Sequence, residues 1–227
     1  LERADERFRP ESGKWAPVSG RARVIVYSPE RVAKDTLPKT LNDLTKPEWK
    51  GRLGWAPSNA SFQAHVSALR SIWGEDKTRS WLSGIKANEP SVYPKNSPQV
   101  KAVSSGEIDI GWVNHYYLHK LKAANPTLKA ANHSFAEGDA GNLMMLSGAG
   151  ISAHTKRAEA AEKLVAFLLS DDAQAYFANT VYEYPVRGAV KRHPDVPPLS
   201  ERLVKVKQAA LTDVSGTVAL LRELKLN

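Results

Sequence analysis

Residues 106–121 read GEIDIGWVNHYYLHKL, and this stretch indicates the class of fold. Within it, Ile108–Val113 (IDIGWV) alternates in the manner of a strand, and Asn114 is placed to cap a following helix. We expect that helix to cover about residues 115–124. The segment therefore predicts a strand that leads through a capped turn into a helix.

The same order of strand, cap and helix occurs earlier in the chain. Gly51–Ala56 (GRLGWA) predicts a strand, and either Ser58 or Asn59 can cap the next helix. Apolar residues then recur at helical spacing until Gly74 ends the pattern. Two such units of the same polarity predict an α/β sheet whose ligand sites lie beyond the carboxyl ends of its strands.

The rest of the chain continues the mixed pattern, with Arg23–Tyr27 (RVIVY) as a short buried strand. Pro90–Pro98, which contains Asn96, is expected to be a loop, and Ser147–Gly148 to lie in a turn between strands. Further helices are expected over Lys77–Lys86, Gln99–Ser105, Lys156–Leu169, Asp171–Asn179, Leu203–Ala210 and Val218–Leu224.

Composition excludes several classes of protein. A chain of 227 residues with 42% hydrophobic residues can build a full core, as one large domain or as two small lobes. The absence of cysteine excludes thiolate metal sites, thiol catalysis and disulfides. The formal charge of +8 is spread among acidic residues instead of forming a basic run, so we expect no nucleic-acid partner.

The ends of the chain and its hydropathy lead to expectations about location. No apolar run approaches the roughly 20 residues of a membrane-spanning helix, so we expect no membrane insertion of the mature chain. The sequence begins with Leu1 and has no basic-then-apolar leader. Any export signal is therefore expected to have been removed or to lie outside the sequence.

Tyr116 and Tyr117 are adjacent at the expected strand-to-helix turn. Neighbouring residues of a regular strand point to opposite faces, whereas at such a turn both hydroxyls can converge on one point. A phenol loses its proton near about pH 10, so two close phenolates at neutral pH require a strongly polarising cation. Fe³⁺ is such a cation, because a hard trivalent ion prefers anionic oxygen. The alternative is that one tyrosine packs in the core and the other lies on the surface.

His115 and His119 offer a different metal site. They are four residues apart on one expected helix, a spacing that can bring two imidazoles to a zinc ion, but no third ligand stands at a matching spacing. The chain also has no G-x-S-x-G motif, Walker loop or dinucleotide-binding fingerprint. We therefore expect no enzyme, with a zinc-dependent hydrolase as the alternative from that class.

Small polar residues precede the helix that is expected after Gly51–Ala56. The run from Ser58 to Ser61 can leave backbone N–H groups directed at a common spot, where the helix dipole assists an anion. This arrangement predicts an anion cradle. Ordinary N-capping without a bound anion is the alternative explanation.

A set of longer motifs runs in order from about Lys14 to the end of the chain. They are W-x-P-x-S-G-R-A-R-V-I-V-Y, L-x-D-L-x-x-P-x-W-K-G-R-L-G-W-A-P-x-N-A-S-F-Q, W-L-x-G-I, Y-x-K-N-S, G-E-I-D-I-G-W-V-N-H-Y-Y, A-A-E-K-L-V-A-F-L-L-S-D-D-A-Q and Y-E-Y-P-V. Together they resemble the ferric-ion-binding periplasmic proteins of bacterial iron importers, a bilobal family with the type II periplasmic-binding-protein fold.

The resemblance implies roles for particular residues. The paired iron tyrosines of the family correspond to Tyr116 and Tyr117. Where members use a helper anion such as phosphate, carbonate or citrate, its cradle corresponds to three residues of one loop and two asparagines of other loops: Asn59, Ala60, Ser61, Asn96 and Asn114. Asn59 and Ser61 differ from the family's usual Ser-Gly-Ala type of cradle, which leaves the anion open.

The resemblance also implies an architecture and a mechanism. Residues 29–140 plus 198–227 would form a complete lobe, and residues 1–28 plus 141–197 the hinge strands and the remainder of a lobe that lacks its N-terminal section. That section brings the other iron ligands in complete members. Closure of the two lobes would complete the coordination shell and exclude water.

The implied protein is a monomer that captures Fe³⁺ or a ferric chelate and delivers it to the membrane permease of an ABC importer. It would reside in the periplasm, or be lipid-anchored outside the cell membrane. A carrier of another small anion or organic cation, such as sulfate, phosphonate, thiamine or a polyamine, is the alternative on the same fold. The tyrosine pair distinguishes the two, since those ligands do not need adjacent phenols.

Overall fold

The structure, a computed structural model, describes residues 2–199, 204, 206, 211 and 213–226. It divides into two compact units, one of Leu1–Arg21 with Met144–Leu199, and one of Ala22–Leu143 with the described part of the C-terminal segment. We call these unit 1 and unit 2. The assignment of a complete and a shortened lobe stays a prediction.

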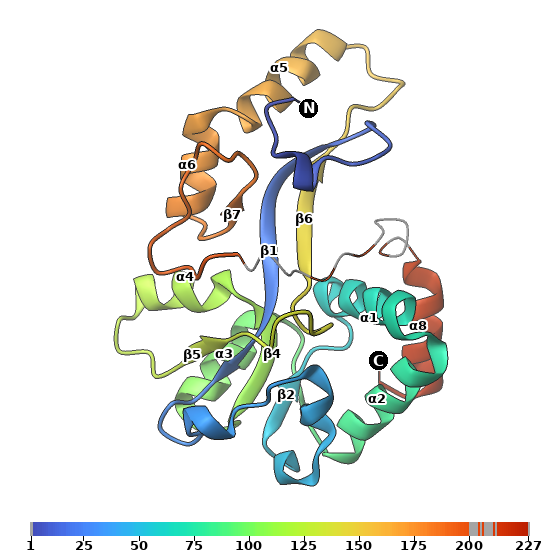
Figure 1. The fold of residues 1–227 in the computed structure, drawn as a ribbon, viewed down its shortest axis with the longest axis vertical. Helices are drawn as coiled ribbons and strands as arrows, with labels where there is room; N and C mark the ends of the chain where they lie inside the picture. The colour runs from blue at the N-terminus through green and yellow to red at the C-terminus, as the bar shows by residue number, and fades with distance from the viewer. Residues whose placement is uncertain (1, 200–203, 205, 207–210, 212, 227) are drawn as a thin grey trace. The chain divides into compact units, whose positions relative to one another are not determined.

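Helices and strands are interspersed along the chain (Figure 1). The strands are β1 (Ala16–Tyr27), β2 (Leu53–Trp55), β3 (Ser91–Val92), β4 (Ile110–Asn114), β5 (Ala131–His133), β6 (Met144–Ala149) and β7 (Tyr184–Pro185). The α-helices are α1 (Ala60–Trp73), α2 (Glu75–Ala87), α3 (Asn96–Ser105), α4 (Tyr116–Ala124), α5 (Ala158–Leu168), α6 (Asp171–Asn179) and α8 (Val214–Glu223). Short 3-10 turns cover Glu6–Phe8, Lys34–Thr36, Leu41–Thr45 and Pro47–Trp49.

The sheet of unit 2 has the strand order β3-β2-β4-β1-β5. β2 runs parallel to both β3 and β4, whereas β1 is antiparallel to β4 and β5. The register of β1 and β4 pairs Arg23 with Asn114 and Tyr27 with Ile110. The expected α/β sheet with strand–helix units of one polarity is therefore confirmed, with β1 as an antiparallel addition.

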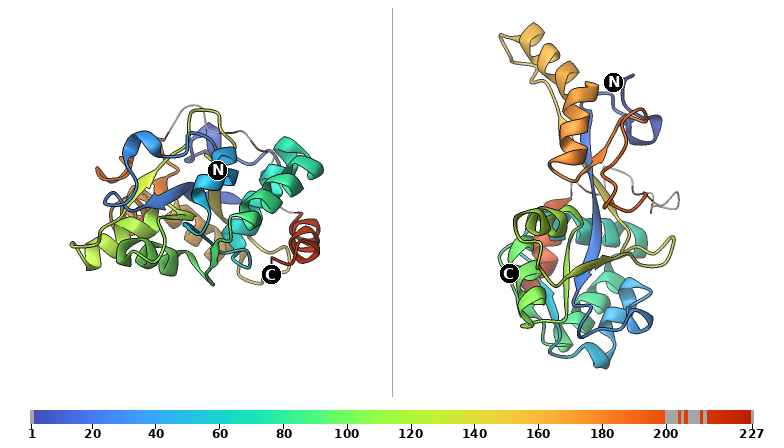
Figure 2. Two further views of the ribbon diagram at one scale, coloured as in Figure 1. Left: turned by 90° about the horizontal axis from the view of Figure 1, so that it is seen from below. Right: turned by 90° about the vertical axis from the view of Figure 1, so that its left-hand side faces the viewer.

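Helices cover both faces of this sheet, and the side chains of β1 alternate between them. Ile25 and Tyr27 pack into one core with side chains of α1, α2 and α8, while Val24 and Val26 pack into a second core with α3 and α4. This alternation follows from the two-residue period of a strand. Figure 2 shows the layers of unit 2 from two further sides.

Several boundaries differ from those expected. β1 begins at Ala16, seven residues before the predicted strand (23 − 16 = 7), because its first half pairs with β7 in unit 1. Asn96 is the first residue of α3 and does not lie in a loop. Ser147 and Gly148 lie within β6 and not in a turn. The helix predicted at 203–210 falls mostly on residues outside those that the structure describes.

Unit 1 has a small core of Ala16, Leu169 and Val186. α5 buries none of its residues, and Leu164 and Phe167 are 58% and 59% exposed. No helix in the described part of the chain has both the length and the apolar character that a membrane crossing requires.

Candidate functional site

Three helices of unit 2 begin at the same edge of the sheet. β3, β2 and β4 are parallel, and each is followed by a helix: α3, α1 and α4, respectively. The carboxyl ends of parallel strands meet at one edge, so their helix starts lie together. All residues that the sequence predicted for the anion and iron sites lie at these helix starts or, for Asn114, at the end of the preceding strand.

Asn59 caps α1, and its side chain organises the first turn. Its Oδ1 accepts hydrogen bonds from the backbone N–H of Ser61 at 3.1 Å and from the Ser61 hydroxyl at 2.6 Å. The backbone N–H of Ser61 is thus bonded within the cap, where the sequence suggested a free donor. Ala60 is exposed at the first position of the helix.

A buried arginine, Arg23 of β1, links three of the predicted cradle residues. Its Nη1 donates to Oδ1 of Asn114 at 3.0 Å, to Oδ1 of Asn96 at 3.3 Å and to Oγ of Ser61 at 3.3 Å. Its Nη2 donates to the backbone oxygen of Trp112 at 2.9 Å, and the guanidinium lies 4.9 Å from the centre of the Trp112 ring. Ser61, Asn96 and Asn114 therefore converge on one cationic group.

The sequence analysis gave Arg23 no role beyond the first position of a short buried strand. The sequence nonetheless contains a sign that Arg23 is buried, because it directly precedes the four apolar residues VIVY of the strand. Arg21 stands two residues before it, on the same face of the strand. Residues two apart in a strand share a face, so Arg23 lies on the face of Ile25 and Tyr27, which helices cover. Arg23 is only 1% exposed.

The electrostatics of Arg23 connect the cradle to the tyrosines. Burial lowers the pKa of the Arg23 guanidinium to about 9, and the nearby phenols of Tyr117 and Tyr116 act in the opposite direction. The guanidinium is therefore still protonated at neutral pH. The buried cation thus lies within electrostatic reach of both predicted iron tyrosines.

The two predicted iron tyrosines lie side by side. Tyr116 opens α4, and its ring stacks on that of Tyr117 with centroids 4.3 Å apart and an interplanar angle of 28°. Tyr116 is 8% exposed, while Tyr117 is partly buried against the core that contains α3 and α4. The two rings are thus neighbours, and neither is packed away from the other.

Asn114 does not cap α4, as the sequence had suggested. It is the last residue of β4, its side chain bonds to Arg23, and the N-cap position of α4 is His115 without a side-chain cap bond. The reason is the pairing of Asn114 with Arg23 across the sheet, which turns its amide toward β1.

His115 and His119 do not form a zinc site with other histidine or acidic residues in the described ranges. No group of three His, Cys, Asp or Glu side chains in the part of the chain that the structure describes could hold a metal ion. His115 is 1% exposed, and its Nδ1 accepts a hydrogen bond from the backbone N–H of Ala22 at 3.1 Å. That bond gives His115 a role in holding β1 against α4.

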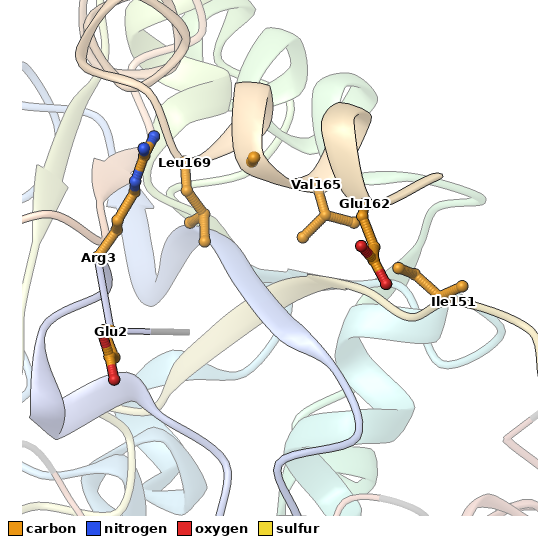
Figure 3. A pocket seen from close by; sticks show the side chains of 7 residues that line it. Glu2, Arg3, Ile151, Glu162, Val165 and Leu169 are labelled. Atoms are coloured by element: carbon orange, nitrogen blue, oxygen red, sulfur yellow. The ribbon is translucent and has the colours of Figure 1, made fainter. Parts of the chain in front are cut away.

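An open pocket lies in unit 1, and none of its lining residues is a predicted site residue (Figure 3). Its lining combines charged side chains with apolar ones from α5 and its surroundings: Glu2, Arg3, Ile151, Glu162, Val165, Ala166 and Leu169. Its lining includes two carboxylates and no tyrosine or histidine, whereas the tyrosine pair lies at a helix start of unit 2.

Comparisons with known proteins identify relatives of this chain. Residues 1–209 match the family described as bacterial extracellular solute-binding protein. The chain is 33% identical to the Fe(3+)-binding periplasmic protein of Serratia marcescens, over 100% of this chain and 68% of the relative. It is 32% identical to the major ferric iron-binding protein of Neisseria meningitidis, over 88% of this chain and 60% of the relative.

A solved structure is similar throughout the chain. Iron-bound HitA from Pseudomonas aeruginosa superimposes with a TM-score of 0.91 at 32% sequence identity, over 98% of this chain and 73% of that protein. The chain therefore matches the fold of a ferric-binding protein over nearly its whole length. It spans 60% to 68% of the length of the two curated relatives.

Proposed function

The chain belongs to the family of bacterial extracellular solute-binding proteins, and on that premise we propose that it captures Fe³⁺ and delivers it to the permease of an ABC importer. The cargo is the ferric ion or a ferric chelate. The protein acts in the periplasm or, alternatively, is held outside the cell membrane by a lipid anchor. The binding unit is a monomer. Similarity to named ferric-binding proteins supports the proposal.

The stacked pair of Tyr116 and Tyr117 is the observation that carries the proposal. Two adjacent phenols at a helix start offer two hard, anionic oxygens to one trivalent ion once their protons have left. Fe³⁺ would displace these protons on binding, and the buried charge of Arg23 lies within electrostatic reach of both rings. Carriers of sulfate or of organic cations have no need of this pair.

A helper anion is part of the same proposal. Asn59, Ala60, Ser61, Asn96 and Asn114 would hold phosphate, carbonate or citrate at the start of α1. The positive end of the helix dipole supports an anion there, as does the charge of Arg23. The anion would supply further oxygen ligands to the iron.

Equilibrium dialysis against a mixture of ferric citrate and zinc citrate tests the choice of metal. We expect the chain to retain iron in preference to zinc, and the double variant Tyr116→Phe/Tyr117→Phe to lose that preference. Tyr176→Phe is the matched control, because Tyr176 lies in α6 of unit 1 and is 57% exposed. Retention of zinc, or of iron at the wild-type level by the double variant, would overturn the proposal.

A further inference from the structure

Arg23 is a buried charge without an acidic partner in the described ranges. No ion pair among the residues that the structure describes involves it, and its Nε is buried without a hydrogen-bond partner. Its hydrogen-bond partners among the described residues are all neutral oxygens: a hydroxyl, two amides and one backbone carbonyl. Burying a charge is costly unless an opposite charge compensates for it. The buried guanidinium therefore lacks a compensating negative charge, which a bound anion would supply.

Arg23 also determines which way the two cradle asparagines face. A guanidinium only donates hydrogen bonds, so the Oδ1 atoms of Asn96 and Asn114 point toward it. The amide donors of both side chains consequently point away from Nη1. The Nδ2 of Asn96 makes only long contacts, 3.4 Å to Oδ1 of Asn59 and 3.3 Å to Oγ of Ser61. This donor is therefore available at the start of α1 for a better acceptor.

We propose that Arg23 is the charged residue of the anion cradle, which neutralises a bound oxyanion and orients the amides of Asn96 and Asn114 so that they donate to it. The inference rests on the proposed function, since it assigns a further residue to the helper-anion site. It names the ligand class as a small oxyanion with several acceptor oxygens, for which a guanidinium fork is well suited. Neither motif spacing nor the resemblance assigns this role to Arg23.

The test is calorimetric titration of the iron-free chain with inorganic phosphate. We expect Arg23→Gln to weaken phosphate binding roughly ten- to a hundredfold, the range for loss of a hydrogen bond to a charged group. Arg23→Lys keeps the charge but not the fork, so an intermediate loss is expected. Arg52→Gln is the matched control: Arg52 is in the same unit, is partly exposed and pairs with Asp109, which also bonds Arg31.

Chemical rescue separates a direct role from a structural one. Arg23→Ala removes the side chain from a buried site, and added guanidinium ion at millimolar concentration should restore phosphate binding. Urea has the same planar shape without the charge, so it should not restore binding. Rescue by both compounds, or by neither in a variant whose circular dichroism spectrum matches the wild type, would argue against the proposal.

The outcomes distinguish this inference from the proposed function. If phosphate binds equally well to the wild type and to Arg23→Gln, the role of Arg23 is wrong while the helper-anion site stands. If the wild type binds neither phosphate, carbonate nor citrate, the helper-anion site and the role of Arg23 fail together. Metal retention through Tyr116 and Tyr117 is measured separately, by the dialysis of the double variant.

Discussion

Arg23 and Asn114 face each other in the register of β1 and β4, and Nη1 of the arginine donates to Oδ1 of the asparagine at 3.0 Å. Both side chains are 1% exposed. This contact ties the strand that passes from unit 1 into unit 2 to the strand that leads into the tyrosine pair. A substitution at Asn114 therefore tests the anion cradle most directly.

Asn114→Asp should abolish phosphate binding while the fold is retained. The new carboxylate has nearly the same shape as the amide, pairs with Arg23 and repels an incoming anion. We expect no measurable phosphate binding by calorimetry and a melting temperature at or above that of the wild type. Asn114→Ala lacks the new charge, so its phosphate binding should be weakened but detectable. Wild-type affinity in Asn114→Asp would contradict the charge relationship.

Asn59→Ala should destabilise unit 2 through loss of the α1 cap. The side chain accepts from the backbone N–H of Ser61, and loss of such a cap costs about 1 kcal/mol. Ser58→Ala is the matched control, because Ser58 is exposed and lies before the cap, and its effect should stay within about 0.5 kcal/mol. Urea unfolding curves measure both. Equal effects of the two substitutions would show that Asn59 is not the cap.

His65 should make the fold sensitive to acid. Burial lowers the pKa of His65 from its ordinary 6.5 to about 3, assisted by the charge of Arg23, while its Nε2 donates to the backbone oxygen of Ala140 at 2.8 Å. Between about pH 3 and pH 6.5, the unfolded state therefore binds a proton on His65 that the folded state does not bind. Stability from this group is complete above pH 6.5 and is lost as pH falls toward 3.

The expected slope from His65 is up to about 1.4 kcal/mol per pH unit within that window. His65→Gln keeps a donor for Ala140 but does not titrate, so its stability should fall less steeply with acidification. Urea unfolding at a series of pH values measures the difference between the two curves. If the stability of the wild type and of the variant fell in parallel with pH, His65 would take up its proton as readily in the folded state as in the unfolded state.

The sequence predicted the strand–helix units well because their patterns are local. Asn59, one of the two candidate caps, Gly74 as the end of α1 and the span Asp171–Asn179 of α6 are all found in the structure. The segment 106–121 likewise gave the strand and the helix that carry the tyrosines. Caps, apolar spacing and glycine stops act within a few residues, so one sequence contains them in full.

The contacts of Arg23 could not be predicted, because they join residues far apart in the chain. The guanidinium bonds Ser61, Asn96 and Asn114 only after β1 has inserted antiparallel beside β4. The same long-range pairing turned Asn114 away from its expected capping role. The local pattern of apolar and polar residues does not tell which strand will lie beside β1 in the sheet.

The visible absorption of the chain with a ferric chelate tests the central claim most directly. Ferric nitrilotriacetate supplies ligands of its own, so a coloured phenolate-to-iron charge-transfer band needs only the oxygens of Tyr116 and Tyr117 from the chain. We predict that such a band appears with the wild type and with Tyr176→Phe, and that Tyr116→Phe and Tyr117→Phe each strongly bleach it. A band of unchanged intensity in both of the latter variants would contradict the assignment of these tyrosines as the iron ligands.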